Sequence, residues 1–244
     1  MHRFFADPEI SDENLFRLSD AEAHHALKVL RLRAGDAAEA IYRGARYLVR
    51  LEILSSGEPV LIPLENLPST EPHLSVTLFQ GLPKGDKMDL IVQKSVEIGI
   101  GRIVPVLFSR CVARPDEKES MKKTQRWQRI SLEAAKQSGR CVIPEVIPPV
   151  SLSLLPEHIS GCEAVAVPWE ECEYGGPQAF VRSHPSLSAL GIVIGPEGGI
   201  SGDEADMLRS IGCETVTLGK RILRTETAGI AALSVFFGLY GEME

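Results

Sequence analysis

Apolar and polar residues follow two different patterns along the chain, and the change falls near residue 70. Before it, short runs rich in β-branched and aromatic residues, separated by turn signals, predict strands at 39–42, 47–54 and 60–64. One helical pattern lies among them, at 21–30. Short strands divided by turns are typical of a small β-rich or barrel-like domain.

A polar, proline-bearing stretch at 67–72 is the best linker candidate, and after it strands and helices alternate. The predicted strands lie at 75–80, 102–107, 142–146, 163–167, 190–194 and 215–218, and the predicted helices at 86–98 and 121–138. A Ser-x-x-Glu capping pattern at 201–204 opens another helix, and the last begins near Thr225. Such alternation predicts an α/β fold with a mainly parallel sheet covered by helices. We therefore expect a first domain at 1–70 and a second at 71–244.

Composition places the protein among ordinary globular proteins. Of its 244 residues, 44% are hydrophobic and 24% charged, which allows a sizeable core. No signal peptide is predicted at the start, and the near-apolar run at 230–240 is too short to span a bilayer, so it indicates a buried or interface helix. The five cysteines include no Cys-x-x-Cys, and the neighbours His24 and His25 point to different helix faces. We expect reduced thiols, a cytoplasmic protein and no metal site.

Charge is distributed unevenly, although the net charge is -7. Residues 84–140 carry 13 Lys and Arg against 7 Asp and Glu. Four basic residues of the helix at 121–138 share one face, with a fifth just beyond: Lys122, Arg126, Arg129, Lys136 and Arg140. A second basic cluster lies near the N-terminus: Lys28, Arg31 and Arg33, with Arg43, Arg46 and Arg50. A solvated helix face is the alternative, but two clusters in an acidic protein favour nucleic-acid binding.

Two glycine-bearing loops each follow an apolar strand. The first contains Gly-Pro-Glu-Gly-Gly at 195–199, and the second turns at Gly219 before the helix near Thr225. Glycine lets the backbone approach a ligand closely, and ligands of open α/β sheets lie beyond the carboxyl ends of the strands. The chain has no Gly-x-Gly-x-x-Gly, P-loop or Gly-x-Ser-x-Gly motif. We predict a small-molecule site formed by these two loops.

Several longer motifs occur together. They include His-Arg-Phe-Phe at 2–5, Gln-Gly-Leu-Pro-Lys-Gly-Asp-Lys at 80–87, Ile-Gly-Pro-Glu-Gly-Gly at 194–199 and Leu-Gly-Lys-Arg-Ile-Leu-Arg-Thr-Glu-Thr-Ala at 218–228. In this combination the chain resembles the RsmE family, small-subunit (16S) ribosomal RNA uracil-N3 methyltransferases of the SPOUT class. The resemblance runs from residue 2 to about 238.

The resemblance implies a PUA-like β-barrel at the N-terminus and an α/β methyltransferase domain with a C-terminal trefoil knot. It also implies a homodimer packed through its C-terminal helices, and S-adenosylmethionine bound by the knot loops. The cofactor-binding residues it indicates are Gly195, Pro196, Glu197, Gly198, Gly199, Leu218, Gly219, Ile222, Leu223 and Thr225. The partner it implies is small-subunit ribosomal RNA or the assembled subunit, bound through Lys28, Arg31, Arg33, Lys122, Arg126, Arg129, Lys136 and Arg140.

Methylation at uracil N3 needs a proton acceptor and donors that stabilise negative charge on the two carbonyl oxygens. We expect Arg224 and Arg221 to supply such donors, although contact with RNA phosphates is the alternative for both. Glu197 is a third catalytic candidate, and Glu226 lies nearby; either carboxylate could instead hold loop amides or a helix end. A nucleotide-dependent enzyme and an RNA-binding module without catalysis are the rival functions.

Overall fold

The computed structural model describes residues 1–243, which divide into two compact units. The first unit contains Met1–Glu71 and a short returning segment, Gly139–Val142. The second contains Pro72–Ser138 and the chain from Ile143 onward. The division into a first domain at 1–70 and a second at 71–244, with separate roles, stays a prediction.

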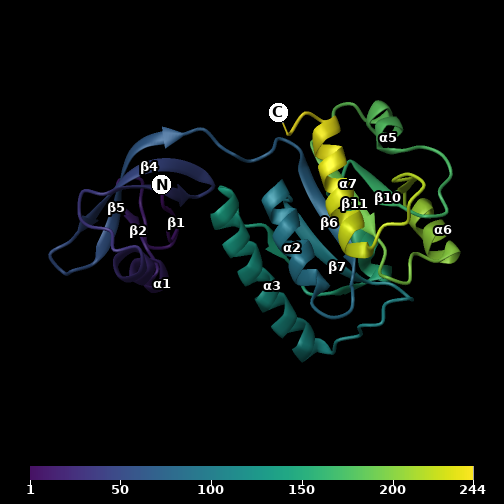
Figure 1. The fold of residues 1–244 in the computed structure, drawn as a ribbon, viewed down its shortest axis with the longest axis horizontal. Coiled ribbons are helices and arrows are strands. Elements are labelled where there is room, and N and C mark those ends of the chain that lie inside the picture. The colour runs from purple at the N-terminus through teal and green to yellow at the C-terminus, as the bar shows by residue number, and fades with distance from the viewer. Residues whose placement is uncertain (244) are drawn as a thin grey trace. The chain divides into compact units, whose positions relative to one another are not determined.

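The first unit is built on a five-stranded sheet with the order β1–β3–β4–β5–β2 (Figure 1). Its strands are β1 (Arg3–Phe5), β2 (Phe16–Arg17), β3 (Ala37–Tyr42), β4 (Ala45–Ile53) and β5 (Pro59–Leu67). The antiparallel strands β3, β4 and β5 overlap the three predicted ones. Strands β1 and β2 are too short for a periodic pattern to indicate them.

The chain just after β1 reaches the opposite edge strand, β2, because the backbone N–H of Asp7 donates to the carbonyl of Arg17 at 2.9 Å. The sheet thereby curves into a half-barrel around a core in which Phe4, Phe16 and Leu51 are fully buried. The predicted helix at 21–30 is present as α1 (Asp20–His24), followed by a wider π-helical turn, η1 (His25–Val29).

Glu39 on β3 forms the main polar contact inside the first unit. Its side chain is buried, and its carboxylate accepts hydrogen bonds from Arg46 Nη2 at 2.7 Å and Arg3 Nε at 2.9 Å. The hydrogen bond from Arg46, with burial opposing and Arg3 assisting, lowers the pKa of Glu39 from 4.5 to about 2. One carboxylate thus links β1, β3 and β4.

The second unit is built on a parallel sheet with the order β12–β10–β11–β6–β7–β8, and the short β9 also pairs with β7. Its strands are β6 (Ser75–Gly81), β7 (Arg102–Leu107), β8 (Glu145–Val146), β9 (Val150–Ser151), β10 (Ala164–Pro168), β11 (Ala189–Ile194) and β12 (Glu214–Val216). All strand pairs in this sheet are parallel, so the predicted α/β class with a parallel sheet is confirmed.

Helices cover both faces of this sheet. They are α2 (Lys87–Ile98), α3 (Glu117–Ser138), α4 (Leu155–Ile159) after the 3₁₀ turn η2 (Leu152–Leu154), α5 (Pro177–Ser183), α6 (Gly202–Ser210) and α7 (Thr225–Leu239). Helices α3, α2 and α7 lie side by side (Figure 1). The predicted capping box opens α6, with Ser201 and Glu204 bonded to each other's backbone. No described helix is long and apolar enough to cross a membrane.

The strand predicted at 142–146 is wrong for most of its length, since only Glu145–Val146 pairs with the sheet. The cause is Glu71, whose carboxylate accepts from the backbone N–H groups of Cys141 at 2.5 Å and Val142 at 3.1 Å. Donors bound to a side chain are not available to a neighbouring strand. Val142 therefore belongs to the returning segment of the first unit, whereas the residues after it belong to the second.

We predict that Glu39→Gln destabilises the first unit by about 3 kcal/mol at pH 7, the free energy that corresponds to its lowered pKa. Because this pKa is depressed in the folded state, the stabilisation is present above pH 4.5 and is lost as the pH falls toward 2. Denaturant unfolding measured across that pH range tests both statements. Glu52→Gln, which removes an exposed pair with Arg50, is the control and should cost less than about 1 kcal/mol. Equal losses for the two variants would contradict the assignment.

Candidate functional site: a three-loop cradle

The strand order brings three loops together at one edge of the parallel sheet. Strands β12, β10 and β11 are consecutive neighbours, so the loops after their carboxyl ends lie side by side. We call these the basic loop (217–224), the tryptophan loop (169–176) and the glycine loop (195–200). The backbone N–H of Thr217 donates to the carbonyl of Gly175 at 3.0 Å, which joins the basic loop to the tryptophan loop. The crevice between them is where ligands bind in sheets of this kind.

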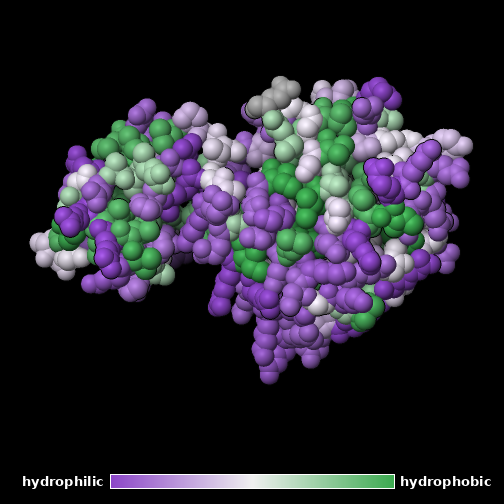
Figure 2. All heavy atoms as spheres, in the orientation of Figure 1, coloured by the Kyte–Doolittle hydropathy of each residue, from purple (hydrophilic) through white to green (hydrophobic). Residues whose placement is uncertain are grey.

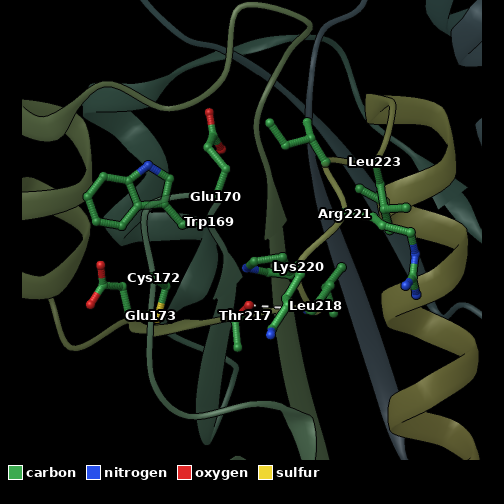
Figure 3. A pocket seen from close by; sticks show the side chains of 13 residues that line it. Trp169, Glu170, Cys172, Glu173, Thr217, Leu218, Lys220, Arg221 and Leu223 are labelled. Carbon is green, nitrogen blue, oxygen red and sulfur yellow. Dashed lines mark hydrogen bonds between the residues drawn. The ribbon is translucent and has the colours of Figure 1, made fainter.

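The basic and tryptophan loops enclose a first hollow of about 490 Å³. In Figure 3, Trp169, Glu170, Cys172 and Glu173 lie on one side of it, and Leu218, Arg221 and Leu223 lie on the other. The guanidinium of Arg221 points away from the other labelled side chains (Figure 3). The hollow combines an apolar lining with a few polar groups, as ligand sites generally do.

The glycine loop forms one wall of a second hollow, of about 300 Å³. Each of the ten residues expected to bind a cofactor lines one or both hollows. Five residues line both: Pro168, Glu170, Ile222, Leu223 and Ala228. Because the two hollows share these residues, they form one continuous cradle.

A buried chain of hydrogen bonds holds the start of the glycine loop. Gln80 Nε2, at the end of β6, donates to Thr225 Oγ1 at 2.8 Å. The Thr225 hydroxyl in turn donates to the carbonyl of Gly195 at 2.6 Å. Gln80 is fully buried and Thr225 nearly so. This chain ties the glycine loop to the first turn of α7.

Two close contacts require glycine in the middle of this loop. Arg110 Nη1 donates to the carbonyl of Gly198 at 3.0 Å, and a Cβ at position 198 would lie 2.8 Å from Arg110 Cβ. Gly199 has φ +73°, and a Cβ there would overlap Glu170 Oε1. A larger residue at position 198 would have to displace the Arg110 backbone. At position 199 it would displace only the Glu170 carboxylate, and the left-handed φ is what favours glycine.

Glu197 is held in an ion pair. Lys87 Nζ lies 2.9 Å from Glu197 Oε1 and 3.3 Å from Glu226 Oε2, and the backbone N–H of Lys84 donates to Glu197 Oε1 at 3.2 Å. Burial alone would raise the pKa of Glu197, but hydrogen bonds from Lys87 and Lys84 lower it. The bond to Glu197 raises the pKa of Lys87. The pair stays charged near neutral pH, which makes Glu197 a weak proton acceptor.

The tryptophan loop is the part of the cradle that sequence reasoning missed. Trp169 Nε1 donates to the carbonyl of Ile200 at 3.1 Å, and the guanidinium of Arg209 lies 4.9 Å from the Trp169 ring centre. Its only sequence signal is its position after the predicted strand at 163–167. That signal indicates a site only when the strand order is known, because β10 lies between β11 and β12 and its loop lies between theirs.

The arginines of the basic loop remain accessible. Arg224 lines the second hollow and Arg221 the first, and both are exposed. Within residues 1–243, neither side chain makes a hydrogen bond or ion pair. Their donors are therefore available to a ligand.

The basic positions on α3 share an outer face, opposite the buried Trp127 and Ser131. Lys122 and Arg129 are exposed, whereas Arg126 pairs with Asp89. Figure 2 shows hydrophilic side chains gathered over this helix. Lys136, half-buried, lies 3.7 Å from Glu133.

Arg140 does not belong to this face, because it is only 5% exposed and forms a bidentate pair with Glu71, with Nε–Oε2 at 2.8 Å and Nη2–Oε2 at 2.5 Å. In the first unit, Lys28, Arg31, Arg33 and Arg43 are exposed. Arg46 and Arg50 are paired with Glu39 and Glu52.

No group of three or more His, Cys, Asp or Glu residues in the described part of the chain could hold a metal ion. The lining of the cradle offers a ligand backbone groups, carboxylates, arginines and apolar side chains.

Comparison with known proteins agrees with this architecture. A family model described as an RNA methyltransferase domain matches residues 70–237, and one described as an RNA methyltransferase PUA domain matches residues 18–64. The parallel sheet with its clustered loops, together with a PUA domain, defines the class: SPOUT-type RNA methyltransferases.

Similar proteins narrow this class. The ribosomal RNA small subunit methyltransferase E of Bacillus subtilis is 34% identical over 243 residues, covering 96% of this chain and 95% of that protein. The protein of the same name from Aquifex aeolicus is 32% identical, and the match covers 96% of this chain and 98% of that protein. The chain belongs to the ribosomal RNA small subunit methyltransferase E family, RsmE. The Neisseria gonorrhoeae member, solved bound to S-adenosyl methionine, has a TM-score of 0.83 and 33% identity, with 98% of each chain covered.

We predict that Thr225→Val loosens the glycine loop, because it removes the hydroxyl that joins Gln80 to Gly195. The buried Gln80 amide loses one of its two acceptors and keeps the Gly81 carbonyl, so the free energy of unfolding should fall by about 1–3 kcal/mol. Hydrogen–deuterium exchange at residues 195–200 should accelerate. Thr227→Val changes an exposed threonine of the same helix and should leave both measurements unaltered. Unchanged exchange in Thr225→Val would show that other contacts hold the loop.

Proposed function

We propose that this protein methylates N3 of a specific uridine in small-subunit (16S) ribosomal RNA, with S-adenosylmethionine as the methyl donor. The observation that carries the proposal is the three-loop cradle at the carboxyl ends of β12, β10 and β11. Membership of the RsmE family and the S-adenosyl methionine bound to the Neisseria relative support it.

The lining of the cradle fits S-adenosylmethionine. Leu218, Ile222 and Leu223 offer an apolar surface for the adenine ring. In the described chain, the backbone N–H groups of these three residues donate no hydrogen bond. Unpaired donors beside an apolar lining suit a heterocycle with ring nitrogens. When bound, S-adenosylmethionine supplies a methyl group on a positively charged sulfur.

The chain must make uracil N3 nucleophilic, since the neutral base carries a proton there. Arg224 is placed to help, because it occupies the N-cap position of α7, lines the second hollow and has free donors. A guanidinium keeps its charge at working pH and stabilises negative charge on a carbonyl oxygen. We propose that Arg224 stabilises the uracil anion. We propose that Arg221, whose guanidinium points away from the other labelled side chains in Figure 3, contacts RNA phosphate.

Glu197 has a positioning role in this proposal. Its ion pair with Lys87 and its bond to the Lys84 amide hold the glycine loop against the start of α2. A carboxylate with a lowered pKa is poorly suited to accept the N3 proton. The uracil proton is accordingly lost to solvent, and the reaction should accelerate as the pH rises.

RNA binding is assigned to two basic surfaces, one on each unit. The surface on α3 consists of Lys122, Arg126, Arg129 and Lys136, and the surface on the first unit consists of Lys28, Arg31 and Arg33. Arg126 would leave its ion pair with Asp89 to bind a phosphate. Exposed Lys and Arg residues contact phosphates irrespective of sequence and so supply affinity.

We also propose a homodimer formed through α7. Val235 is 43% exposed and Leu239 is 37% exposed, and Figure 2 shows hydrophobic atoms over the C-terminal half of this helix. Exposed apolar side chains on an otherwise buried helix favour association. A monomer by light scattering at micromolar concentration would contradict the dimer.

The trefoil knot and cytoplasmic location are further parts of the proposal. Within residues 1–243 the five cysteines are unpaired, which agrees with a reducing compartment. Recovery with the membrane fraction of lysed cells would contradict the location. An experimental structure whose chain does not thread through a loop would contradict the knot.

The function is tested by incubating the protein with labelled S-adenosylmethionine and either unmodified small-subunit rRNA or assembled subunits, then mapping the methylated base. Label at N3 of a single uridine is the expected result. No transfer to either substrate, or transfer to another atom, would refute the proposal. Calorimetry with NAD in place of S-adenosylmethionine tests the nucleotide-dependent alternative. Binding of NAD would support that alternative, and no binding of NAD would exclude it.

We predict that Arg224→Ala and Arg224→Lys both lower the single-turnover rate with saturating RNA and cofactor. Loss of one oriented donor is typically worth about 3 kcal/mol, or about a hundredfold in rate. Affinities for cofactor and RNA should change little. Recovery of the rate at high RNA concentration would indicate that Arg224 positions phosphate instead.

We predict that Arg129→Glu weakens RNA binding and reduces the slope of log affinity against log salt by about 1. Arg182→Glu makes the same charge change on an exposed residue of α5 and should leave the slope unchanged. Cofactor affinity should be equal in both variants. Identical salt slopes for the two variants would show that the basic face of α3 is solvated and does not bind RNA.

A further inference from the structure

Glu170 stands at the junction of the two hollows of the cradle. Among the five residues that line both hollows, it alone carries an ionisable side chain. In the part of the chain that the structure describes, its carboxylate makes no hydrogen bond and no ion pair. The proposed chemistry uses the arginines of the basic loop and leaves this carboxylate unassigned.

Glu170 is exposed, and it lies beside loop residues that are themselves held in place. Glu170 Oε1 occupies the space that a side chain at Gly199 would fill. The preceding residue, Trp169, is fixed by its bond to the Ile200 carbonyl and by the guanidinium of Arg209. Glu170 therefore places a negative group where the two hollows meet, whereas Glu173, also exposed, lines the first hollow only.

Lys220 and Arg221 line the first hollow and Arg224 the second, but among residues 1–243 none of them is paired with this carboxylate. Arg221 points away from the other labelled side chains, whereas Glu170 lies between Trp169 and Leu223 (Figure 3). Lys220 lies at the opposite end of the first hollow, beside Thr217 (Figure 3). An exposed carboxylate without a partner gains one when a ligand brings a positive charge beside it.

S-adenosylmethionine has the matching arrangement: an adenosine part and an amino-acid part joined at a positively charged sulfonium. If each part occupies one hollow, the sulfonium lies at their junction. We infer that Glu170 is the counter-ion of the sulfonium and makes the site prefer S-adenosylmethionine to its product, S-adenosylhomocysteine. This inference rests on the proposed function.

The preference follows from the charge balance of the reaction. The lone pair of uracil N3 forms the new N–C bond, and the electron pair of the breaking S–C bond returns to sulfur. The sulfonium thereby becomes a neutral thioether, and its attraction to Glu170 disappears. A carboxylate at this point would bind the donor tightly and release the product after each turnover.

The experiment compares three ligands by calorimetry with the full-length protein: S-adenosylmethionine, S-adenosylhomocysteine and sinefungin, an analogue with an amine in place of the methylated sulfur. Glu170→Gln should weaken the binding of S-adenosylmethionine and of sinefungin about tenfold, which is the loss expected for one partly screened charge pair. The same change should weaken the binding of S-adenosylhomocysteine less than about twofold. Glu171→Gln, the same change at an exposed neighbour outside both hollows, should alter none of the three.

An equal loss for all three ligands in Glu170→Gln would overturn the inference, because the carboxylate would then contact a group that they share. Unchanged binding of all three would overturn it as well. A wild-type protein that binds none of them would instead refute the proposed cofactor. Retained thermal stability of Glu170→Gln shows that any loss comes from the site.

Discussion

The cradle depends on the fixed position of the glycine loop. The hydroxyl of Thr225 holds its first carbonyl and is itself held by the buried amide of Gln80. Further along the loop, Glu197 is paired with Lys87, the Gly198 carbonyl accepts from Arg110, and the Ile200 carbonyl accepts from Trp169. Contacts from β6, α2, α7 and two other loops thus determine a segment of six residues. A loop held in this way can present backbone groups to a ligand without first being ordered.

The charged groups around the cradle fall into two kinds. Glu197 and Glu226 are both paired with Lys87, and these contacts serve the structure of the loop. Arg221, Arg224 and Glu170 have no partner among the described residues and are available to ligands. The arrangement sets positive charge where an anionic base and phosphates are expected, and it sets Glu170 where a cationic donor is expected. In this cradle, the presence or absence of an ion-pair partner separates structural charges from those available to ligands, whereas residue type does not.

Much of the second unit could be predicted from local patterns. Periodicity indicated β6, β7, β10, β11 and α2 close to their observed bounds, because apolar spacing reflects which side of an element is buried. The glycine loop was recognisable because three glycines and a proline within five residues are compatible with few other structures. Strands β1 and β2, by contrast, are too short to carry a period. The segment after Ser138 diverges from the predicted strand because a carboxylate distant in sequence, that of Glu71, binds its amides.

The sequence by itself determined the alternation of strands and helices, the two loops rich in glycine and basic residues, and the motifs of the RsmE family. These are properties of neighbouring residues, and propensity and spacing act over short distances. The tertiary structure decided the strand order, which inserts the tryptophan loop between the other two, and it decided which charges are paired. Arg140 meets Glu71 across 69 positions, and Lys87 meets Glu197 across 110. Such partners are selected by the packing of the whole sheet, because a side chain has no local signal for a charge that far along the chain.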